Sequence, residues 1–232
     1  MKKFILCSAL VAVAGALFAA DAKEEVTAAI KKLGEQPNYS WKTTVVVPDS
    51  ARWRPGPTEG KTEKGGVLYQ KMTFGDNTTE IVKQGDKAAF TDRDGEWQSA
   101  ANSEGQEGRG RFMAAMVRSL QAPAAQAADI AGGVKEFKSD GDAWAGDLTE
   151  DAAKNLMRFR RGGGDGPTIS DAKGSAKFWI KDGVLSKYEF KLSGKMDFNG
   201  NEMDMDRTTT VEIKDVGTTK VEVPEGAKAK LS

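Results

Sequence analysis

The side chains that most enzymes use for catalysis are scarce in this sequence. Histidine is absent, and the single cysteine, Cys7, lies inside an apolar N-terminal run. The absence of histidine excludes Ser-His-Asp triads, Cys-His dyads and histidine-ligated zinc or iron sites. A Ser-Lys pair or two carboxylates stay open as catalytic groups, but no spacing points to either. The sequence therefore predicts a protein that is not an enzyme and needs no cofactor.

The segment 197–206 is rich in acidic and amide side chains and begins like a calcium-binding loop. Asp197, Asn199 and Asn201 stand at alternating positions, but the sixth position is Glu202, where such a loop requires glycine. An Asn-Gly pair inside the segment is also a strong hairpin signal. We interpret the segment as a solvated hairpin tip and predict no metal site.

Two further polar patterns have simple interpretations. The glycine run 162–166 follows a predicted helix and precedes no Lys-Ser or Lys-Thr pair, so it lacks the context of a phosphate-binding loop and is expected to be mobile. Two arginine clusters could contact anionic lipid headgroups, although clusters this short more often serve solubility. The clusters are Arg109, Arg111 and Arg118, and Arg158, Arg160 and Arg161.

Large, adaptable apolar side chains recur on one face of several predicted strands and of one predicted helix. Methionine and phenylalanine fit irregular guests better than valine or isoleucine do, so a concave sheet lined with them could hold an acyl chain. The alternative is an ordinary core under the helices. The candidate lipid-binding residues are Met72, Phe74, Phe90, Phe112, Met116, Leu120, Phe178, Ile180, Tyr188, Phe190, Phe198, Met203 and Met205.

The elements that must position these residues follow from periodicity. Apolar and polar residues alternate over many short segments, which predicts antiparallel strands with one wet and one dry face, and three helices to cover the dry face. The predicted strands are 39–47, 67–74, 78–83, 87–91, 134–138, 143–147, 172–181, 184–198, 203–213 and 221–224. The predicted helices are 21–33, 111–121 and 149–161, with a further alanine-rich turn or two at 124–131. Residues 52–66 are predicted to form a long loop, and 225–231 a short terminal turn. No linker separates the halves, so residues 21–232 form one domain of the α+β class.

The N-terminus has the three parts of a secretory signal peptide. Two lysines precede an uncharged apolar run, 4–20, that closes with small residues. We predict cleavage after Ala20 or after Ala22, which leaves a mature chain without cysteine. Cys7 stands near the start of the run, too early to carry a lipid, so the mature protein is expected to be exported, soluble and not lipidated. An uncleaved N-terminal anchor is the alternative.

The charge balance argues against a nucleic-acid partner. The chain holds 34 basic and 34 acidic residues, and removal of Lys2 and Lys3 leaves 32 against 34, a net charge of −2. A nucleic-acid binder carries a basic excess.

The order of elements resembles a known family. The residues that carry the resemblance are Tyr39-Ser40-Trp41, the helix start 148–153, and the hairpin 178–188 with its Trp-x-x-Asp-Gly turn. They are similar to the bacterial lipoprotein-carrier superfamily, which includes the LolA and LolB carriers and the LppX/LprG lipid-binding lipoproteins. The resemblance implies a strongly curved antiparallel half-barrel covered by helices on its concave face. It also implies that acyl chains bind between the two, with helices 111–121 and 149–161 as a lid.

From the residues and this resemblance we expect a periplasmic, non-enzymatic carrier or sensor of acyl chains, with transient contact to a membrane or membrane protein. The alternative is a structural or protein-interaction domain of the envelope, whose core is filled by its own side chains. Desolvation would drive binding, because each buried methylene contributes ~0.8 kcal/mol.

Overall fold

The computed structural model describes residues 10–51, 54–75, 77–103, 108–158, 167–198 and 200–231, without the side chains of 10–20, Phe74, Arg109 and Phe198. The strands form one antiparallel sheet of 11 strands in the order β6-β5-β4-β3-β2-β1-β11-β10-β9-β8-β7. It is open, because β6 and β7 lie at opposite edges. The strands are β1 (Asn38–Val46), β2 (Thr58–Glu63), β3 (Val67–Phe74), β4 (Asn77–Gln84), β5 (Lys87–Thr91), β6 (Trp97–Ser99), β7 (Lys138–Asp140), β8 (Ala143–Asp147), β9 (Thr168–Lys181), β10 (Val184–Phe198) and β11 (Asn201–Lys214).

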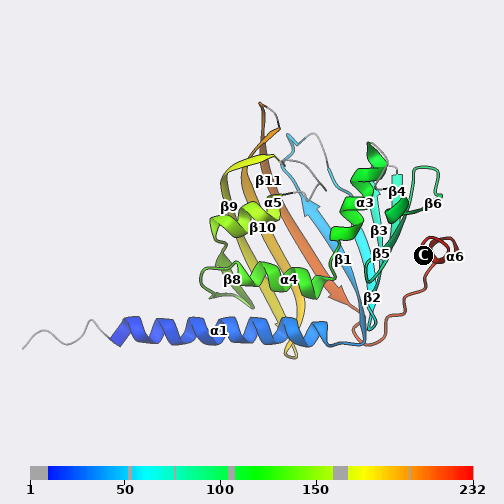
Figure 1. Ribbon diagram of the computed structural model, residues 1–232. Coiled ribbons are helices and arrows are strands. Elements are labelled where there is room, and N and C mark those ends of the chain that lie inside the picture. Colours follow the sequence, from blue (N-terminus) through cyan, green and yellow to red (C-terminus); the bar gives the residue numbers. More distant parts are fainter. Residues whose placement is uncertain are drawn as a thin grey trace, which may run out of the picture.

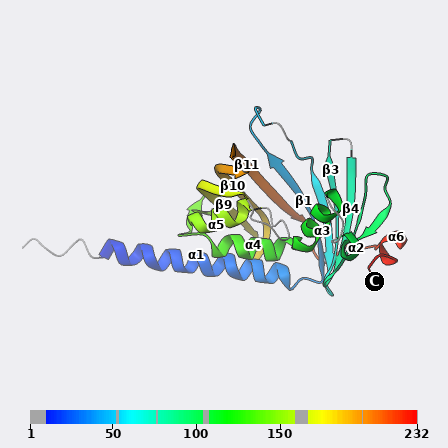
Figure 2. The ribbon, with the colours of Figure 1, turned by 45° about the horizontal axis from the view of Figure 1, so that its top comes forward.

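Six helices accompany the sheet within the described part of the chain. Helices α1, α4 and α5 lie over β8 to β11, whereas α2 and α3 lie over β3 to β5 (Figures 1 and 2). Helix α6 lies outside the far edge, beside β6. Their bounds are α1 (Leu10–Gly34), α2 (Ala100–Ser103), α3 (Arg109–Ser119), α4 (Pro123–Gly132), α5 (Glu150–Met157) and α6 (Glu225–Lys228). The predicted α+β half-barrel with helices on its concave face is confirmed.

The apolar side chains divide into three clusters. The major cluster joins α1, α4 and α5 to β1, β9, β10 and β11, and includes Phe178 and Tyr188, both 0 % exposed. The minor cluster joins α2 and α3 to β3, β4 and β5 around Ile81. A small outer cluster lies on the convex face, where α6 packs on Val82 and Ala89. The concave face is therefore covered by two separate helical units.

Helix α1 extends well beyond the rest of the molecule at its N-terminal end (Figure 1). Among the α1 residues whose side chains are described, Ala22, which is 1 % exposed, packs in the major cluster together with Val26, Ile30 and Leu33. This spacing of three and four residues is the apolar stripe that the sequence predicts. No helix among the described residues is both long and apolar enough to span a bilayer.

Several boundaries differ from the sequence prediction. The expected loop 52–66 contains strand β2, whose alternation is hidden because glycine and threonine fill its concave positions. The expected strand 134–138 is replaced by a single bridge from Val134 to Leu148, and pairing starts only at Lys138. Helix α5 ends at Met157, and 159–161 lie outside the described residues. Residues 221–224 form no strand.

Candidate functional site on the concave face

A continuous row of paired residues crosses the concave face of the sheet. Buried residues stand on both sides of its middle: Phe178 and Tyr188 belong to the major cluster and Met72 to the minor cluster, while Trp144 at one end is half-buried and packs against the major cluster. Thr43 and Thr58, in the middle, are only half-buried. In sheet order the row is Trp144, Phe178, Tyr188, Val211, Thr43, Thr58 and Met72. The two helical units thus leave the centre of the concave face less covered than its flanks.

Along β1 and β11, the exposure of concave-face residues increases toward the end of the sheet where β1 stops, whereas Leu192 and Met196 of β10 stay buried there. In the neighbouring row of paired residues, Thr209 of β11 lies between Phe190 of β10 and Val45 of β1. Phe190 is 5 % exposed, whereas Val45 is half-buried. Farther along β11, Met205 is half-buried and Met203 is 56 % exposed. Apolar side chains therefore remain partly open to solvent on the concave side.

Helix α3 borders this region. Its buried residues, Met113, Ala114 and Val117, pack on the minor cluster, while Met116 is half-buried. Leu120, just after the helix, packs against both the major and the minor cluster. We call the half-buried residues Thr43, Val45, Thr58, Met116, Leu120 and Met205 the concave strip.

Two basic side chains rise from the concave face to the C-terminal ends of the covering helices. The Lys83 ammonium donates to the carbonyl oxygens of Arg118 (2.5 Å) and Leu120 (2.9 Å), at the end of α3. Arg207 donates from Nη2 to the carbonyl oxygen of Leu156 (3.1 Å), near the end of α5. Cations are favoured there because the last carbonyls of a helix carry negative partial charge. Burial lowers the pKa of Lys83 and of Arg207.

Aromatic packing fills the flank beneath α1, α4 and α5. The rings of Phe178, Tyr188 and Phe190 stack in series, with centroids 6.4 and 6.5 Å apart, and Phe137 meets Phe178 edge-on at 5.8 Å. The Tyr188 hydroxyl donates to Gln126 of α4 (2.6 Å), which ties the helix to the sheet. This part of the concave face is a packed core.

The predicted lipid-binding residues therefore fall into different environments. Met72 and Phe90 are buried in the minor cluster, and Phe178, Tyr188 and Phe190 in the major cluster, with Ile180 packed against it. Met116, Leu120 and Met205 belong to the concave strip, while Phe112 and Met203 are 41 % and 56 % exposed. The side chains of Phe74 and Phe198 lie outside the described residues.

Sequence reasoning missed Lys83, Arg207 and Val45. The signal for the two basic residues was available, because each interrupts the apolar alternation of its strand on the concave face. Helix α3 is also rotated relative to the prediction: Met113 faces the sheet and Phe112 faces outward. A helix of 11 residues with apolar side chains on several sides leaves its orientation to its neighbours.

The acidic segment 197–206 lies at the hairpin that joins β10 to β11. At the hairpin tip the Gly200 amide donates to Asp197 (2.7 Å), and Lys195 pairs with Glu202 (2.8 Å). No group of three His, Cys, Asp or Glu among the described residues could hold a metal ion. The glycine run 162–166 lies outside the described residues; Arg111, Arg118 and Arg158 are exposed.

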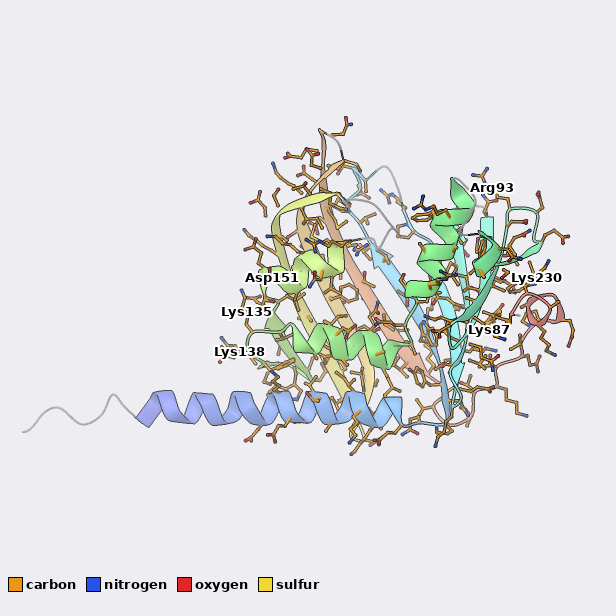
Figure 3. The ribbon with its side chains drawn as sticks, in the orientation of Figure 1. Lys87, Arg93, Lys135, Lys138, Asp151 and Lys230 are labelled. Atoms are coloured by element: carbon orange, nitrogen blue, oxygen red, sulfur yellow. The ribbon has the colours of Figure 1, made fainter. Side chains whose placement is uncertain are left out.

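Charged side chains lie mostly on the periphery. Figure 3 labels six that are exposed; they come from α5, from both edges of the sheet and from the C-terminal turn. These are Lys87, Arg93, Lys135, Lys138, Asp151 and Lys230.

Solved structures with a similar arrangement of the chain exist at low identity. LprF from Mycobacterium bovis shows 10% identity and a TM-score of 0.46, over 90% of this chain and 98% of LprF. The lipoprotein LppX of Mycobacterium tuberculosis shows 9% identity and a TM-score of 0.47, over 88% of this chain and 99% of LppX. A LolA superfamily protein from Nitrosomonas europaea shows 10% identity and a TM-score of 0.34, over 87% and 94%.

LppX and the LolA superfamily, which the sequence resembles, are thus among the structures to which this chain is similar. At such low identity and TM-scores the similarity assigns no role to any residue. No protein-family model matches the sequence, and no curated protein matches it.

Proposed function

We propose that this protein is an exported, non-enzymatic carrier that holds an acyl chain in the concave strip, with α3 as a movable cover. The observation that supports it best is the uneven coverage of the concave face. Both flanks are sealed by helices, whereas Val45, Met116 and Met205 keep apolar surface partly open between them. Soluble proteins rarely leave such surface open in a concave region without a ligand or partner.

Binding would be driven by desolvation of both surfaces. Each methylene moved out of water contributes ~0.8 kcal/mol, so ten methylenes supply on the order of 8 kcal/mol before the cost of ordering the chain. No specific polar anchor is required.

The second candidate function is a structural domain of the envelope. It is favoured by the complete burial of Phe178, Tyr188 and Leu192, which fill the flank under α1, α4 and α5 without any ligand. In this case the concave strip is residual surface and binds nothing.

Adjacent valines at the end of β1 give a matched pair of variants that separates the two functions. Val45 pairs with Thr209 on the concave face, while Val46 is 62 % exposed and pairs with Thr208 on the opposite face. We expect Val45→Asp to weaken binding of a fluorescent fatty acid at least tenfold, because a carboxylate in the strip opposes burial of the chain. Val46→Asp should bind like the wild type.

Native mass spectrometry of protein from the cell envelope supplies the second measurement, and a co-purifying lipid is expected. Protein that is empty in that experiment and also fails to bind the fluorescent fatty acid would favour the structural domain. Equal binding by folded Val45→Asp and Val46→Asp would place the chain outside the concave strip.

We further propose that export is accompanied by cleavage after Ala20. The side chain of Ala22 is 1 % exposed within the major cluster, so cleavage after Ala22 would remove a packed methyl group, whereas cleavage after Ala20 retains it. N-terminal sequencing of the envelope protein should begin at Asp21. A chain beginning at Lys23 would contradict this.

A further inference from the structure

A groove of about 750 Å³ lies at the other end of the concave face, away from the open end of the strip. It runs between the last turns of α1, the first turns of α4 and the turn that joins β2 to β3. Its apolar wall consists of Ile30, Ala122, Ala125 and Ala128. The volume falls in the range of small-molecule sites, about 300–1,000 Å³.

A buried tyrosine lines this groove. Tyr39 is 3 % exposed and accepts a hydrogen bond from the Ala124 amide (3.3 Å). Within the described part of the chain the Tyr39 hydroxyl donates no hydrogen bond. A buried donor without an acceptor is costly, so this O–H calls for an acceptor from a ligand. Burial raises the pKa of Tyr39, which keeps the hydroxyl protonated at neutral pH.

The N-terminus of α4 favours a ligand oxygen atom beside the Tyr39 hydroxyl. Pro123 has no amide hydrogen, and the Ala125 and Gln126 amides donate to the carbonyl of Ala122, so the backbone donors of this turn are already used. The positive end of the helix dipole still attracts a partial negative charge, and the bond from Ala124 polarises the Tyr39 hydroxyl.

The rim of the groove carries balanced charge. Lys31 and Glu35 form an i, i+4 pair at 3.8 Å on α1, and Glu63 and Lys64 stand next to each other beside the turn. Two ammonium groups and two carboxylates give no net charge. The rim therefore offers no excess of cations that would select a carboxylate or a phosphate monoester.

We propose that this groove binds a single acyl chain through its ester carbonyl, which accepts the Tyr39 hydrogen bond, and that the headgroup beyond it is neutral or zwitterionic. The chain lies along Ile30 and the alanines of α4, and the headgroup lies among the four rim charges. This inference rests on the proposed carrier function and names a ligand class for a second site, distinct from the concave strip.

Calorimetric titration with ligands of one acyl chain tests this assignment. It is carried out in the Val45→Asp background, in which the concave strip no longer competes for the acyl chain, and each further variant in this titration is made in that background. We expect monooleoylglycerol and oleoyl-lysophosphatidylcholine to bind the groove, and oleate to bind it at least tenfold more weakly at pH 8. The Tyr39→Phe variant should lose about 3- to 10-fold in affinity for monooleoylglycerol, the effect of one hydrogen bond. The Ala128→Trp variant should abolish this binding, because the indole fills the groove from an exposed position.

Ala229→Trp is the control, since Ala229 is exposed on the C-terminal turn and does not line the groove. It should bind like Val45→Asp alone. Unchanged affinity in both Tyr39→Phe and Ala128→Trp would overturn the assignment, and oleate binding as tight as that of monooleoylglycerol would overturn the choice of headgroup.

The two sites can fail independently. Val45→Asp should leave monooleoylglycerol binding in the groove intact, and Ala128→Trp should leave fluorescent fatty acid binding in the strip intact. A wild-type protein that binds monooleoylglycerol but no fluorescent fatty acid would contradict the carrier proposal for the strip. The opposite result would contradict the present inference.

Discussion

Gly60 of β2 leaves room on the concave face because glycine has no side chain. The Trp41 indole lies directly over it, so that a Cβ built on Gly60 would come within 2.1 Å of the ring. Trp41 is 4 % exposed and packs at 6.1 Å from the ring of Tyr39. The glycine therefore lets one aromatic residue of β1 cover β2, which explains why β2 carries so little apolar surface of its own.

We expect Gly60→Ala to destabilise the protein by about 1–3 kcal/mol, because the indole must move away from tightly packed neighbours. Thermal unfolding monitored by circular dichroism measures the change. Gly132→Ala is the control: a Cβ there has no atom within 4 Å, and its stability should not fall. An unchanged Tm in Gly60→Ala would mean that the indole is free to shift.

The burial of Phe190 makes it unsuitable for a substitution that tests ligand binding. Its alternation with polar neighbours suggested a cavity wall, yet it is 5 % exposed and stacks on Tyr188. A charged substitution there would report on folding. Val45, half-buried on the same face, reports on binding.

At the scale of elements, the covering helices depend on the sheet for their C-terminal ends. Lys83 holds the end of α3 and Arg207 holds the end of α5, each from a separate half of the sheet. At their N-terminal ends the two helices differ in their caps: Gly108 provides no side-chain hydrogen bond to α3, whereas the Thr149 hydroxyl oxygen accepts from the Ala152 amide at the start of α5.

Reciprocal variants test this dependence. We expect Lys83→Met to speed amide hydrogen exchange in α3 and not in α5, because the last carbonyls of α3 lose their donor. Arg207→Met should do the reverse. Hydrogen exchange followed by mass spectrometry of peptides from the two helices measures both. Equal acceleration in the two helices would show that they open as one unit.

Irregular pairing between β9 and β10 interrupts the period of two that the sequence predicts for 184–198. Strict alternation would put Ser186 on the same face as Tyr188, but a register shift between Leu185 and Lys187 puts Leu185 there instead, at 0 % exposure. A second shift, between Ser193 and Lys195, lies opposite Asp171, whose φ of 53° is unusual for a residue with a side chain. Bulges of this kind increase the local bend and twist of the sheet.

For the whole molecule, the state of the tyrosines reports on the integrity of both faces. The chain has three tyrosines. Burial raises the pKa of Tyr39 and raises that of Tyr188 well above its ordinary value near 10. Burial, followed by the hydrogen bond and charge of Glu80, raises the pKa of Tyr69 to about 12.

The folded state therefore favours the protonated phenols, and this stabilisation is present below pH 10 and lost as the pH rises from 10 through 12. We expect less tyrosinate absorbance at 295 nm in the folded protein at pH 10 than in the unfolded chain, and a joint rise of tyrosinate and unfolding as the pH increases further. In guanidinium chloride all three tyrosines should titrate near pH 10. A tyrosine that ionises near pH 10 while the protein stays folded would contradict this burial.

The sequence by itself determined the fold class and most strands and helices. Alternation with period two in 172–181 and 184–198, and the Asp-Gly and Asn-Gly turns, predict long antiparallel strands because side chains alternate between faces. The absence of histidine restricted the possible chemistry by composition alone. These are local properties, and local properties can be read from neighbouring residues.

Only the tertiary structure decided which apolar residues are core and which remain open. Met72, Phe190 and Met205 look alike in sequence, yet two are buried and one is half-buried, because burial depends on which helix covers which strand. The groove beside Tyr39 also brings together segments that are distant in the chain. Whether an apolar residue of the sheet is covered by a helix depends on packing between distant segments, which the periodicity of a single segment does not predict.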